Sequence, residues 1–243
     1  MTATPLPPRI ALELVDKALV LGKRHFWALM RLALIPFLAA TGIVYLFGRP
    51  ATTVTGRMAA TLAAYVAYAL MEAVTMVGAW DLLHGTPLDV GEAWSRVRRR
   101  AISVPTSFVI RIFLMVLGGI ALVLPGLYFL AIYFAVPGVN AIEDLSLRAS
   151  LARSRALALG SIPGILVSVG AYWILAVLVS LGLARGLRLL GAPFAVRTIV
   201  SISWGAVIVP FRAALSALVY LELRIRREGY DLQRALGSLP SAA

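Results

Sequence analysis

Cysteine is absent from the 243-residue sequence, and histidine occurs only twice, at His25 and His84. The absence of cysteine excludes disulfide bonds, thiolate metal sites and a cysteine nucleophile, and two histidines are too few for a multi-histidine metal centre. Charged residues are also scarce, at 14% of the chain against about 25% in average globular proteins. We therefore expect neither a metal nor another cofactor.

Hydrophobic residues, in contrast, make up 60% of the chain, and the mean hydropathy is +0.89. A soluble domain of this length could not hide so much apolar surface in one core, so the composition predicts a membrane protein. Backbone polar groups cannot stay unpaired in lipid, and continuous apolar runs without period-two alternation favour helices over a barrel. Crossing the hydrocarbon core takes roughly 20 residues. The segments that meet this length lie at about 25–47, 58–80, 102–124, 127–142, 162–184 and 198–221.

The basic residues predict the orientation of these six spans. The formal net charge is +12, from 23 Lys and Arg against 11 Asp and Glu. One side of the predicted membrane carries Arg9, Lys17, Lys23, Arg24, Arg96, Arg98, Arg99, Arg100, Arg148, Arg153, Arg155, Arg224, Arg226, Arg227 and Arg234. The other side carries only Arg49, Arg57, Arg185, Arg188 and Arg197. Because basic loops stay in the cytoplasm, we expect both termini to be cytoplasmic.

The chain repeats one plan three times, in units at about 9–80, 88–142 and 145–221. Each unit has a basic amphipathic stretch, at 9–24, 88–100 and 145–159, followed by two spans. The sequence thus predicts a single all-α membrane domain over residues 1–243, built as three hairpins, each preceded by an interfacial helix. In the cytoplasmic tail, 222–243, an apolar face of Leu232, Ala235 and Leu236 could fold back on these helices.

The three amphipathic stretches have two interpretations. They act only as a positive-inside signal with a helical shape, or they form docking surfaces for anionic lipid or a partner. The acidic pair Glu143-Asp144 is expected to cap the start of the third stretch, where carboxylates meet the positive end of the helix dipole. The candidate lipid contacts are Arg96, Arg98, Arg99, Arg100, Arg153, Arg155, Arg224, Arg226 and Arg227.

Charged residues also occur within the spans. Insertion scales put the cost of such a charge at about 2.5–3.5 kcal/mol at the centre of the bilayer. Glu72, Arg111 and Arg212 should each lie about two helical turns from the cytoplasmic end of a span. We expect them to form one cluster. The cluster either locks helix packing or lines a polar cavity for an anionic headgroup or solute, since two arginines face one glutamate.

Proline is expected to interrupt the first span at Pro36, the fourth at Pro137, the start of the fifth at Pro163 and the sixth at Pro210. Such breaks are common packing features of membrane helices, and they also occur in the broken helices of transporters. A tight turn is expected at 124–126, because Pro presets the backbone and Gly adopts permissive dihedral angles. The fourth span is the shortest, and it either crosses fully or is re-entrant.

Catalytic and nucleic-acid signatures are missing from the sequence. It has no G-x-S-x-G elbow, no Walker A loop, no dinucleotide fingerprint and no paired metal carboxylates. Its basic runs lack the interleaved aromatics of a nucleic-acid reader. We therefore expect neither an enzyme nor a nucleic-acid partner.

Three stretches resemble a known family: Leu124 to Tyr128; Pro137 to Glu143 together with Ala152-Arg153-Ser154 and Gly160; and the ending YLELRIRREGYD from Tyr220. They are similar to the bacterial glycerophosphoryl diester phosphodiesterase membrane-domain family. In some relatives this region is fused to a soluble phosphodiesterase that carries the chemistry, and the His and acidic motifs of that enzyme do not occur here. The resemblance implies a membrane module of bacteria and no reaction of its own.

These observations predict a non-enzymatic module of the bacterial cytoplasmic membrane that interacts with anionic lipid and organises or regulates a membrane partner. Membrane lipids are the expected partners, with a membrane protein, a cytoplasmic protein or a second copy of the chain as further candidates. The alternative is a small transporter or channel for an anionic or amphiphilic solute, which would use Glu72, Arg111 and Arg212.

Overall fold

The computed structural model describes residues 11–48 and 53–230 of the chain, and regular structure in these ranges is entirely helical. The helices are α1 (Ala11–Arg24), α2 (Phe26–Ile43) with a π-helical extension η1 (Val44–Gly48), α3 (Val54–Leu83), α4 (Val90–Arg99), α5 (Ser103–Ala121), α6 (Val123–Ile132), α7 (Val136–Ile142), α8 (Leu147–Ala158), α9 (Ile162–Leu189) and α10 (Phe194–Glu228). The prediction of an all-α chain is thus confirmed at this level.

Six helical segments are long and apolar enough to cross a membrane: Phe26–Phe47, Val54–Leu83, Ser103–Ile120, Val123–Ile142, Ile162–Leu189 and Phe194–Glu228. They coincide with the six predicted spans and indicate a multi-pass membrane protein. Helices α3, α9 and α10 are longer than the spans predicted from the apolar runs. The last turns of α10 contain Arg224, Arg226 and Arg227. The helix ends before Gly229, which adopts a left-handed conformation with φ +57°.

Side-chain caps position several helix starts. Thr53 accepts a hydrogen bond from the Gly56 amide at the start of α3 (3.1 Å), and Asp89 accepts one from the Glu92 amide at the start of α4 (3.0 Å). Ser146 plays the same part for α8. These short polar side chains satisfy amides that have no partner within the helix. The expectation that the pair 143–144 caps α8 is wrong, because the helix begins only at Leu147, with Ser146 as its N-cap.

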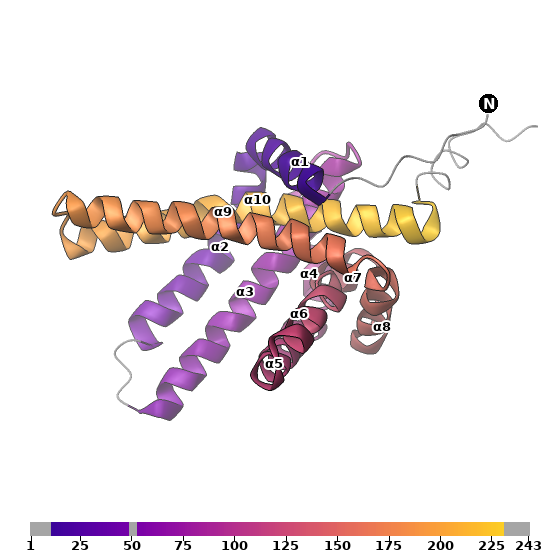
Figure 1. Ribbon diagram of the computed structural model, residues 1–243, viewed down its shortest axis with the longest axis horizontal. Helices are drawn as coiled ribbons and strands as arrows, with labels where there is room; N and C mark the ends of the chain where they lie inside the picture. The colour runs from indigo at the N-terminus through magenta and orange to yellow at the C-terminus, as the bar shows by residue number, and fades with distance from the viewer. Residues whose placement is uncertain (1–10, 49–52, 231–243) are drawn as a thin grey trace, which may run out of the picture.

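Helix α10 is the central element. It contacts α1, α2, α3 and α9, and its buried residues concentrate between Val209 and Leu223. Figure 1 shows α9 and α10 as a long pair that runs crosswise to α2, α3 and the α5–α6 pair. The largest apolar core lies around this crossing, with Tyr220 and Leu29 fully buried in it. Outside the crossing, the helices expose apolar side chains such as Ile120 and Ile174, as expected of helices in contact with lipid.

The prolines interrupt fewer helices than their number suggests. Helices α2 and α10 continue through Pro36 and Pro210, so the predicted breaks in the first and sixth spans are wrong. Pro163 lies in the first turn of α9, where its missing N–H costs nothing. In the fourth span, α6 ends at Ile132 and α7 begins at Val136. The predicted break therefore exists, and Pro137 follows it in the first turn of α7.

The turn between the third and fourth spans lies earlier than expected. Leu122 is extended, with φ −166° and ψ 148°, and it alone separates α5 from α6. Pro125 and Gly126, predicted to form the turn, belong to the first turns of α6 instead. Proline fits there because the first amides of a helix have no partner within it.

Glycines allow α5 and α6 to lie against each other. A Cβ atom at Gly126 would come within 2.8 Å of the Gly119 amide nitrogen, and one at Gly118 within 2.8 Å of the Gly126 amide nitrogen. Backbone atoms cannot move aside as a flexible side chain can. Only glycine therefore permits this approach, which is typical of close helix contacts in membranes.

Gly126→Ala is expected to lower the unfolding temperature in detergent, because the added methyl group meets the backbone of α5. Gly119→Ala is the matched control. A Cβ at Gly119 meets nothing within 4 Å, and alanine is the better helix former by about 1 kcal/mol, so this variant should be neutral or stabilised. Equal unfolding temperatures for the two variants would contradict the close approach.

The three predicted interfacial stretches are separate helices, α1, α4 and α8, each with one buried face. In α4, Ala93 and Val97 are fully buried, whereas Arg98 and Arg99 are exposed. Helix α4 packs on α3 and α7, and α1 packs on α9 and α10. Residues 9 and 10 of the first stretch, and the predicted fold-back of Leu232, Ala235 and Leu236, lie outside the described part of the chain.

Candidate functional site

The three charged residues predicted to cluster within the spans are brought together by α3, α5 and α10. Arg111 of α5 donates two parallel hydrogen bonds to Glu72 of α3, from Nη1 to Oε1 at 2.9 Å and from Nη2 to Oε2 at 2.8 Å. The two side chains are only 9% and 8% exposed. This bidentate geometry suits a guanidinium and a carboxylate, and it is the strongest form of such a pair.

Arg111 makes two further contacts that extend the cluster. Its Nη1 donates to the Phe134 carbonyl oxygen at 3.3 Å, at the junction between α6 and α7. Its guanidinium also lies over the Phe108 ring, 4.7 Å from the centroid, a favourable cation–π distance. One side chain therefore connects α3, α5 and the broken fourth span.

Arg212 completes the cluster without a matching acid. Its Nη1 lies 3.9 Å from Glu72 Oε2, beyond hydrogen-bond distance, whereas Arg111 hydrogen-bonds to both oxygens of this carboxylate. Its Nη2 is buried and has no hydrogen-bond partner among the described residues. Two arginines share one glutamate, so the cluster carries one positive charge in excess.

A half-enclosed cavity of about 170 Å³ lies beside Arg212, between α2, α3, α9 and α10. Its other lining residues are apolar or aromatic apart from one phenol: Phe37, Tyr68, Met71, Trp173, Gly205, Ile208 and Val209. Arg212 is its charged group. A small acidic group with an apolar remainder fits this combination better than a fully polar solute does.

The buried pair should be essential for stability. Removing one partner of such a pair leaves an uncompensated charge and typically costs about 3–5 kcal/mol. We expect Glu72→Ala and Arg111→Ala each to lower the unfolding temperature in detergent strongly, and Glu72→Met/Arg111→Met to recover only part of the loss, because Arg212 then has no acid nearby. Arg31→Ala, which removes an exposed arginine of α2, should leave the unfolding temperature nearly unchanged. Full stability of the single variants would show that the pair does not hold the helices together.

The nine arginines predicted to contact lipid fall into two groups. Four are exposed and form no ion pair among the described residues, namely Arg98, Arg99, Arg155 and Arg227. The other five pair within the chain, namely Arg96, Arg100, Arg153, Arg224 and Arg226. Arg96, Arg100, Arg153 and Arg224 contact other segments of the chain and so help to hold helices together, a role that was not predicted. Arg226 pairs with Glu222 within α10.

Arg153 shows this role most clearly. It donates to both carboxylate oxygens of Glu143, at 2.8 and 3.0 Å, and it pairs with Glu228 at the end of α10. Tyr220 of α10 also donates to Glu143. The hydrogen bonds to Glu143 and Glu228 raise the pKa of Arg153 above its ordinary value. This clamp joins α7, α8 and α10. Its residues 143, 153 and 228 all lie in the stretches quoted for the family resemblance, but no contact between them was predicted.

Arg224 is surrounded by aromatic rings. Its guanidinium lies 4.1 Å from the centroid of Tyr230, 5.8 Å from that of Trp80 and 5.9 Å from that of Tyr220. Its Nε also donates to Glu228 at 3.1 Å. These contacts fix the end of α10 against the end of α3, and they leave Arg224 poorly placed to bind a headgroup.

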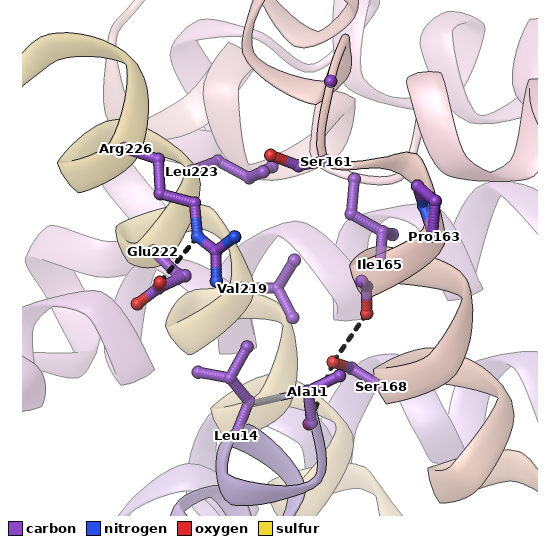
Figure 2. A pocket seen from close by; sticks show the side chains of 12 residues that line it. Ala11, Leu14, Ser161, Pro163, Ile165, Ser168, Val219, Glu222, Leu223 and Arg226 are labelled. Carbon is purple, nitrogen blue, oxygen red and sulfur yellow. Dashed lines mark hydrogen bonds and ion pairs between the residues drawn. The ribbon is translucent and has the colours of Figure 1, made fainter. Parts of the chain in front are cut away.

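A second cavity, of about 180 Å³, lies where α1, the start of α9 and the last turns of α10 meet. Figure 2 shows Arg226 and Glu222 of α10 on one wall, joined by a 2.7 Å ion pair. On another wall, Ser168 of α9 donates to the Ala11 carbonyl oxygen at 3.0 Å. Because Glu222 neutralises Arg226, this cavity attracts an anion less than the one beside Arg212.

Comparison with protein-family models, curated proteins and solved structures finds no match to this chain. The resemblance to the glycerophosphoryl diester phosphodiesterase membrane-domain family therefore stays a prediction.

Proposed function

We propose that the chain is a non-enzymatic integral membrane module that binds anionic lipid and thereby organises or regulates a membrane partner. The observation that carries the proposal is the excess positive charge of Arg212 beside a largely apolar cavity. The proposal places the module in a bacterial cytoplasmic membrane with both termini in the cytoplasm, in line with the distribution of basic residues.

The excess charge gives the reason for an anionic ligand. Arg212 is partly buried, with 23% of its side chain exposed, but its buried Nη2 atom loses hydration that the protein does not replace, and such an unpaired N–H costs about 1–3 kcal/mol. An acidic headgroup in the cavity would offset this cost by accepting a hydrogen bond from the Arg212 Nη2 atom. The rings of Phe37 and Trp173 would then contact the apolar part of the same molecule.

The exposed arginines support the same conclusion from the surface. Arg98 and Arg99 on α4, Arg155 on α8 and Arg227 on α10 are exposed next to the helix faces that pack on the bundle. Basic residues near an anionic membrane surface contribute about 1 kcal/mol each. In the proposal, α1, α4 and α8 are interfacial helices that precede the pairs α2–α3, α5–α6 and α9–α10, and they concentrate acidic lipid around the bundle.

Arg212→Gln should weaken the binding of acidic lipid. In native mass spectrometry of the full chain in detergent, we expect at least one phosphatidylglycerol molecule to bind the variant about tenfold more weakly than it binds the wild type. Phosphatidylcholine binding should not change. Arg31→Gln, which removes the same charge from an exposed position on α2, is the matched control. An equal loss in both variants, or in neither, would contradict a specific site at Arg212.

A small transporter or channel for an anionic or amphiphilic solute is the second candidate. It is favoured by one observation, the interruption between α6 and α7 at the carbonyl that Arg111 binds. Discontinuous helices next to buried charges are a feature of transport sites.

If the chain is such a transporter, the wild type should carry an organic anion into proteoliposomes, and Arg212→Gln should lower the rate of this flux at least tenfold. The Arg31→Gln variant should keep the wild-type rate. Flux that persists at the wild-type rate in Arg212→Gln would exclude transport through this cluster.

A further inference from the structure

The tip formed by the end of α9 and the start of α10 is basic, and no acidic residue balances it. Arg185, Arg188 and Arg197 lie within thirteen residues of sequence, and no aspartate or glutamate occurs between Asp144 and Glu222. None occurs between Asp16 and Glu72 either, the stretch that contains α2 and η1. Every element at this tip therefore lacks an acidic side chain that could neutralise the arginines.

Two of these arginines line one cleft of about 470 Å³, the largest of the three cavities described for this chain. Arg188 comes from the last turn of α9 and Arg197 from the first turns of α10. The other lining residues are Tyr45 of η1, together with Ala184, Leu187, Phe194, Thr198 and Ser201. The Arg197 Nε atom is buried and has no hydrogen-bond partner among residues 11–48 and 53–230.

This set of groups suits a phosphate. Two guanidinium groups supply two positive charges and many N–H donors in planar forks, which match the oxygens of phosphate. The hydroxyl groups of Thr198 and Ser201 add short donors on the same wall. A buried N–H that is left without an acceptor costs about 1–3 kcal/mol, so a phosphate oxygen at Arg197 Nε would be stabilising.

The surroundings of the cleft indicate that the phosphate belongs to a lipid. Leu189 and Leu190, which directly follow Arg188 at the end of α9, are 88% and 82% exposed. Leucines so exposed at the end of an apolar helix pair fit a position in the membrane interface, next to lipid headgroups. Leu187 and Phe194 in the cleft wall can contact the start of an acyl chain.

We propose that this cleft binds the phosphate headgroup of a membrane lipid, at a site separate from the cavity beside Arg212. Figure 1 shows the tip of the α9–α10 pair at the end of the molecule remote from α8 and from the Gly229 end of α10. If the termini are cytoplasmic, the site faces the outer leaflet. A positive-inside signal disfavours arginines on that face, and a phosphate ligand explains why two of them line this cleft.

The test is native mass spectrometry of the full chain in detergent, with dioleoyl phosphatidic acid as the probe and dioleoyl phosphatidylcholine as the neutral reference. Measurements in an Arg212→Gln background keep the two sites distinguishable. We expect Arg188→Gln/Arg197→Gln to weaken phosphatidic acid binding at least tenfold. Arg197→Lys keeps the charge but loses the fork, and it should weaken binding severalfold.

Arg185→Gln is the matched control, because it removes the same charge from the same end of α9 but lies outside the cleft. Its affinity for phosphatidic acid should stay within about twofold of the Arg212→Gln parent. Equal affinities in the double variant and this control would overturn the proposal. Full displacement of the lipid by millimolar inorganic phosphate would overturn it too, since the site would then recognise the free anion.

Discussion

A charge inside an apolar helix has to find an opposite charge, and the packing of this bundle depends on how Glu72 meets that requirement. Arg111 satisfies both carboxylate oxygens and also binds the Phe134 carbonyl oxygen. This side chain therefore fixes α3, α5 and the junction of α6 with α7 relative to one another. The central helix α10 adds Arg212 at 3.9 Å, where a third charge is tolerated only because Glu72 is near.

The remaining charges follow a simple division. On the side of α4, α8 and the end of α10, acids pair with several of the arginines, and pairs such as Arg153 with Glu143 hold helix ends together. Other arginines of this side, such as Arg98 and Arg99, stay exposed. At the opposite tip the arginines have no acids at all. Arg212 is an intermediate case, because the one acid near it, Glu72, is also paired with Arg111. An excess of positive charge at two places in one membrane protein is most simply explained by binding of anionic membrane lipids. The proposed lipid-binding module follows from that.

The sequence was sufficient to predict the spans and the charged cluster within them, because both depend on the residues of each segment alone. Twenty apolar residues define a span, and counting residues from its end places Glu72, Arg111 and Arg212 at one depth. What the sequence could not predict are contacts between distant segments, such as the clamp from Arg153 to Glu228 or the aromatic rings around Arg224. The proline predictions failed for a different reason. A helix held by neighbours on several sides continues through a proline such as Pro210, despite the lost hydrogen bond.

The most direct test of the account is an experimental structure of the full chain in nanodiscs that contain phosphatidylglycerol. If Arg212 binds an acidic lipid, the map will show density for an acidic headgroup in the cavity lined by Phe37, Trp173 and Arg212, with an oxygen within hydrogen-bond distance of the Arg212 Nη2 atom. A cavity that holds only an acyl chain, or that is closed by its own side chains with Arg212 turned toward water, would contradict the claim that the excess charge serves an anionic ligand.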